Sequence, residues 1–345
     1  MRASAFAAGL LTFTLLLVAG ATVLQGQEAP SPDGPPPPSS ASPVDEGAPV
    51  ATLKVKSNLV NVYFSVRDKN GYITNLHKDD CTITEDKTPQ TIKNFTQEKN
   101  LPLTIGILLD TSGSQMHVLS LEQESGAQFL KDVITPKDEA FLISFDVNVD
   151  LLADYTNSPR ELKRAMEKAT INTGAGSGSV TGNGPARGTL LYDAVYLAAH
   201  DKLRQEAGRK ILVLLTDGGD QGSQENLKTA TEAAQKANAI VYVILIADRG
   251  FYGGFNMGYS GDRDMEKLAT DTGGRVINVG NDGKRLEAAF DQIQDELRTQ
   301  YLASYTPLND KEDGTFRKLQ VACQKDQKVQ ARKGYYAIAD SADND

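Results

Sequence analysis

The pattern of hydrophobic and polar residues changes twice along the chain. From residue 51 to residue 97 apolar and polar residues alternate, most clearly over residues 60–66, and this alternation predicts short, half-buried strands. Asp68-Lys69-Asn70-Gly71 predicts a turn after the first of them. Residues 81–86 and 90–95 predict further short strands. We therefore expect an all-β arrangement for this part of the chain.

From residue 101 the pattern becomes one of alternating strands and helices. Residues 101–110 form a continuous apolar run, which is typical of a parallel strand buried on both faces. Ser158-Pro159-Arg160-Glu161 predicts a capping box with Pro at the first helical position. Further strands are expected at residues 139–145, 210–217, 239–248 and 274–279, and helices at 114–134, 160–170, 190–205, 223–238, 262–273 and 282–300. This alternation predicts an α/β fold, with a doubly wound, mostly parallel sheet flanked by helices.

The alternating apolar pattern returns after the last predicted helix. Three strand-like runs occupy residues 300–306, 316–324 and 329–338. Three strands are too few for a stable sheet, and the strands before residue 100 are also few. We therefore expect residues 51–100 and 301–340 to complete one small, sandwich-like β-domain, with the α/β domain of residues 101–300 inserted between them.

The first 21 residues have the features of a signal peptide. Arg2 precedes an apolar run over residues 5–20, and small residues surround a cleavage site at Ala21. An uncleaved membrane anchor is the alternative. Residues 22–50 are rich in Pro and predict a disordered linker, which acts either as a spacer or as a segment without a length requirement. We expect an exported protein that is periplasmic, on the cell surface or secreted, with no membrane span in the mature chain.

The composition restricts the class of function. Lys+Arg 36 against Asp+Glu 45 gives a net charge of -9, which argues against general nucleic-acid binding. Cys 2 and His 3 leave too few ligands for zinc-finger or iron–sulfur spacings. In an oxidising compartment Cys81 and Cys323 are a candidate disulfide, because both are expected to point to the apolar side of their strands. Two core thiols that never meet are the alternative.

Oxygen-bearing side chains gather at the predicted carboxyl ends of the parallel strands. Asp110, Ser112 and Ser114 follow the first strand in a Gly-containing turn. Thr189 opens a helix after a Gly-rich loop, and Asp217 ends the strand at 210–217. Open α/β sheets bind ligands beyond the carboxyl ends of their strands, and hard cations such as Mg²⁺ take oxygen ligands. The five residues are therefore candidate ligands of a divalent cation.

The motifs "DTSGS", "GTLLYDA" and "LLTDG" resemble the metal-ion-dependent adhesion site (MIDAS) of von Willebrand factor type A (VWFA) domains. The family signature is Asp-x-Ser-x-Ser, then a Thr, then an Asp, each on a different loop, and the resemblance covers about residues 101–300. Through "EDKTPQ" and "DGTFRKLQV" the whole chain is most similar to the exported VWFA-related proteins of acidobacteria. In that group an aromatic residue stands in place of Cys81, an aliphatic one in place of Cys323, and a Gly in place of Lys87. The two cysteine replacements are what a disulfide needs, whereas Lys87 puts the geometry of its turn in question.

The resemblance also implies how the site works. Asp110, Ser112, Ser114, Thr189 and Asp217 would hold Mg²⁺, or alternatively Mn²⁺ or Ca²⁺, directly or through water. One coordination position would stay open for an Asp or Glu carboxylate of a partner protein. The implied function is cation-dependent protein binding, in adhesion or assembly, and not catalysis.

Two other functions are alternatives to cation-dependent protein binding. One alternative is a structural envelope scaffold with a vestigial metal site. A Mg²⁺-dependent hydrolase is less favoured, because an aspartyl phosphotransferase has a second Asp where this chain has Ser112, and no Gly-x-Ser-x-Gly motif occurs.

Asp193 and Asp220 are expected to cap helices or to support the site from outside the ligand set. Residues 172–188 are expected to form a mobile loop flanking the site, and residues 251–259 a surface loop.

Overall fold

The computed structural model describes residues 59–98, 101–172, 188–246 and 261–338. These residues all belong to one compact unit spanning residues 56–345. The predicted signal peptide and linker lie outside the described residues, as do the loop at 251–259 and nearly all of the Gly/Ser-rich loop at 172–188. Within the described ranges, no helix is both long enough and apolar enough to cross a membrane.

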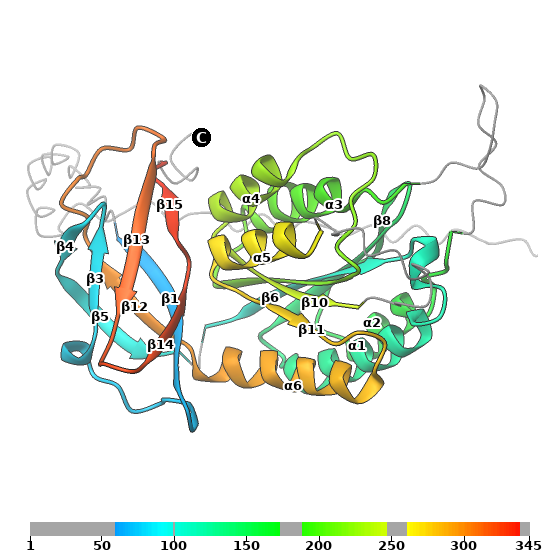
Figure 1. Ribbon diagram of the computed structural model, residues 1–345, viewed down its shortest axis with the longest axis horizontal. Helices are drawn as coiled ribbons and strands as arrows, with labels where there is room; N and C mark the ends of the chain where they lie inside the picture. The colour runs from blue at the N-terminus through cyan, green and yellow to red at the C-terminus, as the bar shows by residue number, and fades with distance from the viewer. Residues whose placement is uncertain (1–58, 99–100, 173–187, 247–260, 339–345) are drawn as a thin grey trace, which may run out of the picture. The chain divides into compact units, whose positions relative to one another are not determined.

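Six strands form one sheet in the order β11-β10-β9-β6-β7-β8 (Figure 1). All neighbouring pairs are parallel except β7 with β8, which is antiparallel. The strands are β6 (Leu103–Asp110), β7 (Glu139–Phe145), β8 (Val149–Thr156), β9 (Arg209–Thr216), β10 (Ala239–Leu245) and β11 (Val276–Asn278). The predicted fold class, a doubly wound and mostly parallel sheet, is confirmed.

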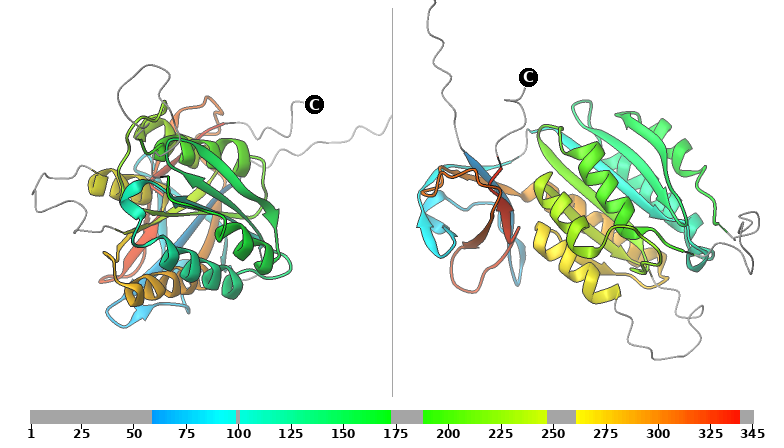
Figure 2. Two further views of the ribbon diagram at one scale, coloured as in Figure 1. Left: turned by 90° about the vertical axis from the view of Figure 1, so that its right-hand side faces the viewer. Right: turned by 90° about the horizontal axis from the view of Figure 1, so that it is seen from above.

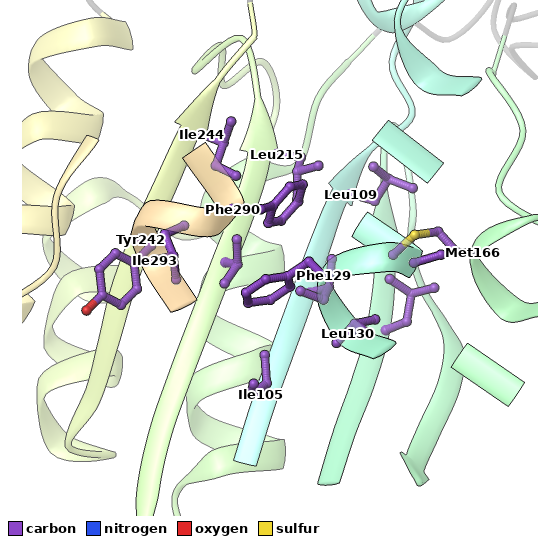
Figure 3. Packing of buried hydrophobic residues seen from close by; sticks show 14 of the residues in the cluster. Ile105, Leu109, Phe129, Leu130, Met166, Leu215, Tyr242, Ile244, Phe290 and Ile293 are labelled. Atoms are coloured by element: carbon purple, nitrogen blue, oxygen red, sulfur yellow. The ribbon is translucent and has the colours of Figure 1, made fainter. Parts of the chain in front are cut away.

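Helices cover both faces of this sheet, as Figures 1 and 2 show. On one face α1 (Leu119–Val133), α2 (Pro159–Met166) and α6 (Gly283–Thr299) pack into one apolar core. On the other face lie α3 (Leu191–Leu197), its π-helical continuation η3 (Ala198–Leu203), α4 (Leu227–Lys236) and α5 (Gly261–Thr272). Figure 3 shows the first core, where the rings of Phe129 and Phe290 stack with centroids 4.8 Å apart among side chains of the sheet.

The central strand β6 is buried along its whole length, which explains its continuous apolar sequence. Gly106 lies in the middle of this strand. A Cβ atom there would be 2.4 Å from the ring of Phe141 and 2.6 Å from the side chain of Leu212. The close fit of the neighbouring strands therefore requires glycine at this position.

The edge strand β8 (Val149–Thr156) was not anticipated from the sequence. Its residues are half-buried or exposed rather than alternately buried, and its pairing with β7 is interrupted by register shifts. The periodic signal is therefore weak. The predicted capping box at Ser158 forms only in part: Ser158 Oγ accepts a hydrogen bond from the Glu161 N–H at 3.4 Å, whereas the Glu161 carboxylate accepts from Thr156 Oγ1 at 2.7 Å.

The two ends of the described chain pair with each other in two antiparallel sheets. One sheet has the order β14-β1-β12-β5, with β2 beside β1, and the other has the order β15-β13-β3-β4. The bounds are β1 (Val60–Asp68), β2 (Gly71–Tyr72), β3 (Thr82–Glu85), β4 (Thr88–Gln90), β5 (Ile92–Gln97), β12 (Tyr301–Tyr305), β13 (Phe316–Ala322), β14 (Lys328–Ala331) and β15 (Gly334–Tyr336). A short 3₁₀ turn, η1 (Lys78–Asp80), precedes β3. Both ends thus build a small β-sandwich, as the sequence predicts.

One predicted strand, residues 329–338, proves to be two strands in different sheets. β14 pairs with β1, and β15 pairs with β13. The chain leaves the first sheet between them, where the Lys333 N–H donates to the Asp271 carbonyl. At Gly334 a Cβ atom would be 2.3 Å from the Arg317 carbonyl oxygen, so the close approach to β13 requires glycine. The alternating pattern continues across this change of sheet, which is why it looks like one strand.

The disulfide between Cys81 and Cys323 is confirmed. In the pairing of β3 with β13, Thr82 lies opposite Ala322, and the next pair outward is the two cysteines. The bond joins residues 242 positions apart in sequence, so it links the two chain ends covalently. The turn that contains Lys87 in place of the usual glycine also forms. Asp86 and Lys87 connect β3 and β4 with φ angles of 47° and 70°, so Lys87 adopts a conformation that favours glycine.

Candidate metal centre

Asp110 is the last residue of β6, and its carboxylate is completely buried. Its Oδ1 accepts a hydrogen bond of 2.9 Å from the Ser112 N–H, and its Oδ2 accepts one of 2.6 Å from Thr216 Oγ1. Thr216 ends the neighbouring strand β9. The two bonds fix the carboxylate at the point where β6 and β9 meet.

The turn after Asp110 brings two serine hydroxyls side by side. Residues Gly113–Gln115 form a short 3₁₀ turn, η2, which begins directly after Ser112. Ser112 Oγ and Ser114 Oγ are 3.0 Å apart, so one hydroxyl donates to the other. Each oxygen keeps lone pairs that are free to bind a cation. The spacing of two residues in this turn thus places neutral oxygen donors next to a buried carboxylate.

Asp217 follows β9 at the same edge of the sheet and is only 4% exposed. Its Oδ1 accepts a hydrogen bond of 3.0 Å from the Gly219 N–H. Gly218 between them has a φ of 85°, a conformation that favours glycine and sharpens the turn. β6 and β9 are neighbours in the sheet although they are far apart in sequence, so their carboxyl ends form the switch point of a doubly wound fold. The structure therefore places Asp110 and Asp217 where such folds bind ligands.

Thr189 is attached to this edge through its main chain. Its N–H donates to the Gln221 carbonyl at 3.0 Å, and the Gln221 N–H donates back at 2.9 Å. Gln221 belongs to the same loop as Asp217, so the two predicted ligands come from paired segments. Hydrogen bonds join Asp110, Ser112 and Ser114, and electrostatics couple Asp217 to Asp110.

The negative charges of Asp110 and Asp217 interact with each other, and a nearby cation would relieve their repulsion. Burial, together with the negative charge of Asp217, raises the pKa of Asp110 from 3.8 to about 7. The predicted ligands consist of two carboxylates and three hydroxyls, a set that suits hard cations such as Mg²⁺, Mn²⁺ or Ca²⁺. No group of three or more His, Cys, Asp or Glu side chains able to hold a metal occurs among the described residues. Any cation here must therefore rely on the hydroxyls and on water for most of its ligands.

Asp146, which no motif in the sequence marks, connects the loops of the site. It follows β7, and its carboxylate accepts hydrogen bonds from Thr111 Oγ1 at 3.0 Å and from Asn172 Nδ2 at 3.3 Å. Its carbonyl accepts a third from the Leu190 N–H at 2.7 Å. Thr111 and Leu190 each neighbour a predicted ligand, so Asp146 positions both loops. Its place at the end of a predicted parallel strand was the available signal.

Asp193 and Asp220 hold main-chain groups near the starts of helices. The Asp193 carboxylate accepts from the N–H groups of Gln224 and Glu225, at 3.1 and 2.8 Å. Asp220 Oδ1 accepts from the Tyr192 N–H at 3.2 Å, in the first turn of α3. Both side chains thus order the loops around Thr189 and Asp217, whereas the N-cap residues of α3 and α4 are Leu190 and Asn226.

The strand order and the antiparallel edge strand agree with the fold that the motifs imply. The α/β part has a fold similar to that of VWFA domains. The resemblance that the motifs carry is therefore confirmed at the level of the fold, and the similarity to the acidobacterial group stays a prediction.

Comparisons with known proteins are limited to solved structures, because no family model and no curated protein matches the sequence. The conserved hypothetical protein BatB from Bacteroides thetaiotaomicron is 18% identical, with 56% of this chain and 98% of that chain covered and a TM-score of 0.42. The vWF domain of the type V pili tip protein Mfa5 from Porphyromonas gingivalis is 13% identical, with 57% and 95% covered and a TM-score of 0.44. Proximal thread matrix protein 1 from the mussel byssus, with a zinc-occupied MIDAS motif, is 15% identical, with 62% and 50% covered and a TM-score of 0.46.

Proposed function

We propose that this chain is an exported, divalent-cation-dependent protein-binding module. It uses Asp110, Ser112, Ser114, Thr189 and Asp217 to hold Mg²⁺, Mn²⁺ or Ca²⁺, and it binds an Asp or Glu carboxylate of a partner protein. The observation that carries the proposal is the pair of buried carboxylates, Asp110 and Asp217, next to two serine hydroxyls 3.0 Å apart at the switch point of the sheet.

The chemistry of the donors supports binding of an external acid. Hydroxyls carry no charge, so only Asp110 and Asp217 offset the charge of a divalent ion. Such an ion still takes further oxygen ligands, and a carboxylate on the partner can fill the coordination position that the five residues leave open. The function is therefore adhesion or assembly through a metal-bridged contact, and no nucleic acid is expected as partner.

The proposed export rests on the predicted signal peptide, residues 1–21, and the disulfide supports it. Bonds such as that between Cys81 and Cys323 persist in oxidising compartments and are rare in the cytosol. Secretion of a reporter protein fused to residues 1–21 tests this part of the proposal. Retention of the reporter in the cytoplasm would refute it.

The metal site is tested by titrating the cation-free protein with MgCl₂ and MnCl₂ in a calorimeter. We expect Ser112→Ala and Asp217→Ala to weaken cation binding by about tenfold or more, because each removes a ligand. Ser120→Ala is the matched control, since Ser120 is exposed on α1. Unchanged cation affinity in Asp110→Ala, the variant that removes the central carboxylate, would defeat the proposed site.

Partner binding is tested with the immobilised protein and an extract of cell-surface and periplasmic proteins. A partner of the proposed kind is retained in Mg²⁺, elutes with EDTA, and is not retained by Ser112→Ala. Retention that withstands both EDTA and the substitution would favour the alternative of a scaffold with a vestigial site. Hydrolysis of a panel of phosphate and carboxyl esters, lost in Asp110→Ala, would instead favour an enzyme.

A further inference from the structure

Two polar side chains close to the predicted ligands are buried without any hydrogen-bond partner among the described residues. Gln115 directly follows Ser114 and is 1% exposed, and Glu122 is 0% exposed. The side-chain nitrogen and oxygen of Gln115 and both carboxylate oxygens of Glu122 have no partner. Buried polar groups are almost always hydrogen-bonded, so four such atoms near one site require an explanation.

Glu122 lies in the first turn of α1, the helix that follows the Asp110–Ser114 loop. The helix buries Glu122 on the same side as Leu119, Gly126 and Leu130. Burial, and then the negative charges of Asp110 and Asp217, raise the pKa of Glu122 well above its ordinary value. The carboxyl group is thus close enough to both predicted acidic ligands to interact with them electrostatically.

Among the described residues, no hydrogen bond compensates for the cost of burying the Glu122 carboxyl group. The nearby charged groups, Asp110 and Asp217, are carboxylates that repel its charged form. The absence of a hydrogen bond disfavours burying its polar atoms at all. An apolar residue would pack at this position on α1 without that cost. A divalent cation held by Asp110 and Asp217 is the one element of the site that would attract a third carboxylate.

We propose that Glu122 is a carboxylate near the cation site that attracts the ion without binding it directly. Together with Gln115, it would face the water molecules bound to the cation. This inference rests on the proposed function and goes beyond its five ligands. Glu122 gives the site a third negative charge against a divalent ion. It therefore strengthens retention of the cation while tempering the attraction for the partner's carboxylate.

The test compares Mn²⁺ binding by the wild-type protein, Glu122→Gln, Glu122→Met and Glu124→Gln. Glu124 is exposed two residues further along α1, so its substitution removes the same charge from the surface. We expect both Glu122 variants to bind Mn²⁺ about 10–100-fold more weakly, as is usual for residues outside the direct ligand set. Glu124→Gln is expected to bind like the wild type.

Unfolding by urea in EDTA separates this role from a purely structural one. Because Glu122 has no hydrogen-bond partner among the described residues, the variants are expected to unfold at urea concentrations no lower than the wild type without cation, and to gain less stability when Mn²⁺ is added. Equal Mn²⁺ affinity in the wild type and both variants would overturn the inference and leave the proposed function intact. A wild-type protein that binds no cation would defeat the proposed function itself.

Discussion

Replacing Asp110 by Asn is expected to stabilise the cation-free protein at pH 8. In the folded chain, burial and the charge of Asp217 raise the pKa of Asp110 from 3.8 to about 7. The folded state thus binds its proton more tightly than the unfolded state does. The stability that this proton supplies is complete below about pH 4 and is lost as the pH rises through about 7.

The shift corresponds to about 4 kcal/mol at pH 8. Asn carries no charge and escapes this cost. Its amide can keep the bond from the Ser112 N–H but has no acceptor for the Thr216 hydroxyl, a loss of about 1 kcal/mol. We therefore expect a net gain of about 2–3 kcal/mol at pH 8, and less than about 1 kcal/mol at pH 5.

Urea unfolding at pH 5 and pH 8, in EDTA and in MgCl₂, measures these differences. Magnesium at about 100 times its dissociation constant adds about 2.7 kcal/mol to the wild type, and Asp110→Asn is expected to gain far less. Asp150→Asn, at an exposed position on β8, is the matched control and should show neither effect. The reasoning fails if Asp110→Asn loses stability equally at both pH values, or if Mg²⁺ stabilises it as much as the wild type.

Three further predictions concern stability, and urea unfolding measures each of them. Lys87→Gly should add about 0.5–1 kcal/mol, because glycine accepts the φ of 70° without strain; a loss would contradict this. Cys81→Ala combined with Cys323→Ala should remove about 2–4 kcal/mol under non-reducing conditions, whereas an unchanged midpoint would show that the bond contributes nothing. Glu296→Gln should cost about 3 kcal/mol, because the buried carboxylate accepts three hydroxyl hydrogen bonds and an ion pair; Glu287→Gln, exposed on the same helix, should cost almost nothing.

The sequence predicts the parts of the fold whose burial is uniform. β6 is buried at every residue and appears as an unbroken apolar run, whereas β8 is partly exposed on both faces and leaves no clear period. The run at 329–338 has the right period but changes sheets at Lys333 and Gly334. Such a change depends on contacts with β13 and Asp271, which local periodicity does not contain.

The site is predictable to the extent that it lies at strand ends. Asp110 and Asp217 close two apolar strands, so topology alone brings them to one edge. Asp146 was missed although it also follows a strand, because its role is to hold neighbouring loops rather than to match a motif. Glu122 was missed because an acid in the first turn of a helix usually faces solvent. Its spacing of three from Leu119 and four from Gly126 was the signal that placed it on the buried face.

The charge balance of the proposed site explains why Asp110 and Asp217 would bind the cation directly, whereas Glu122 would lie outside the ligand set. Asp110 and Asp217 together neutralise a divalent ion, and the hydroxyls of Ser112 and Ser114 add no charge. A third acid among the direct ligands would occupy the position that the partner's carboxylate needs. Glu122, placed on α1 outside the ligand set, adds attraction for the ion and leaves that position open. Glu122→Gln should therefore weaken cation binding without removing a direct ligand, whereas Ser112→Ala removes a ligand and leaves the net charge of the site unchanged.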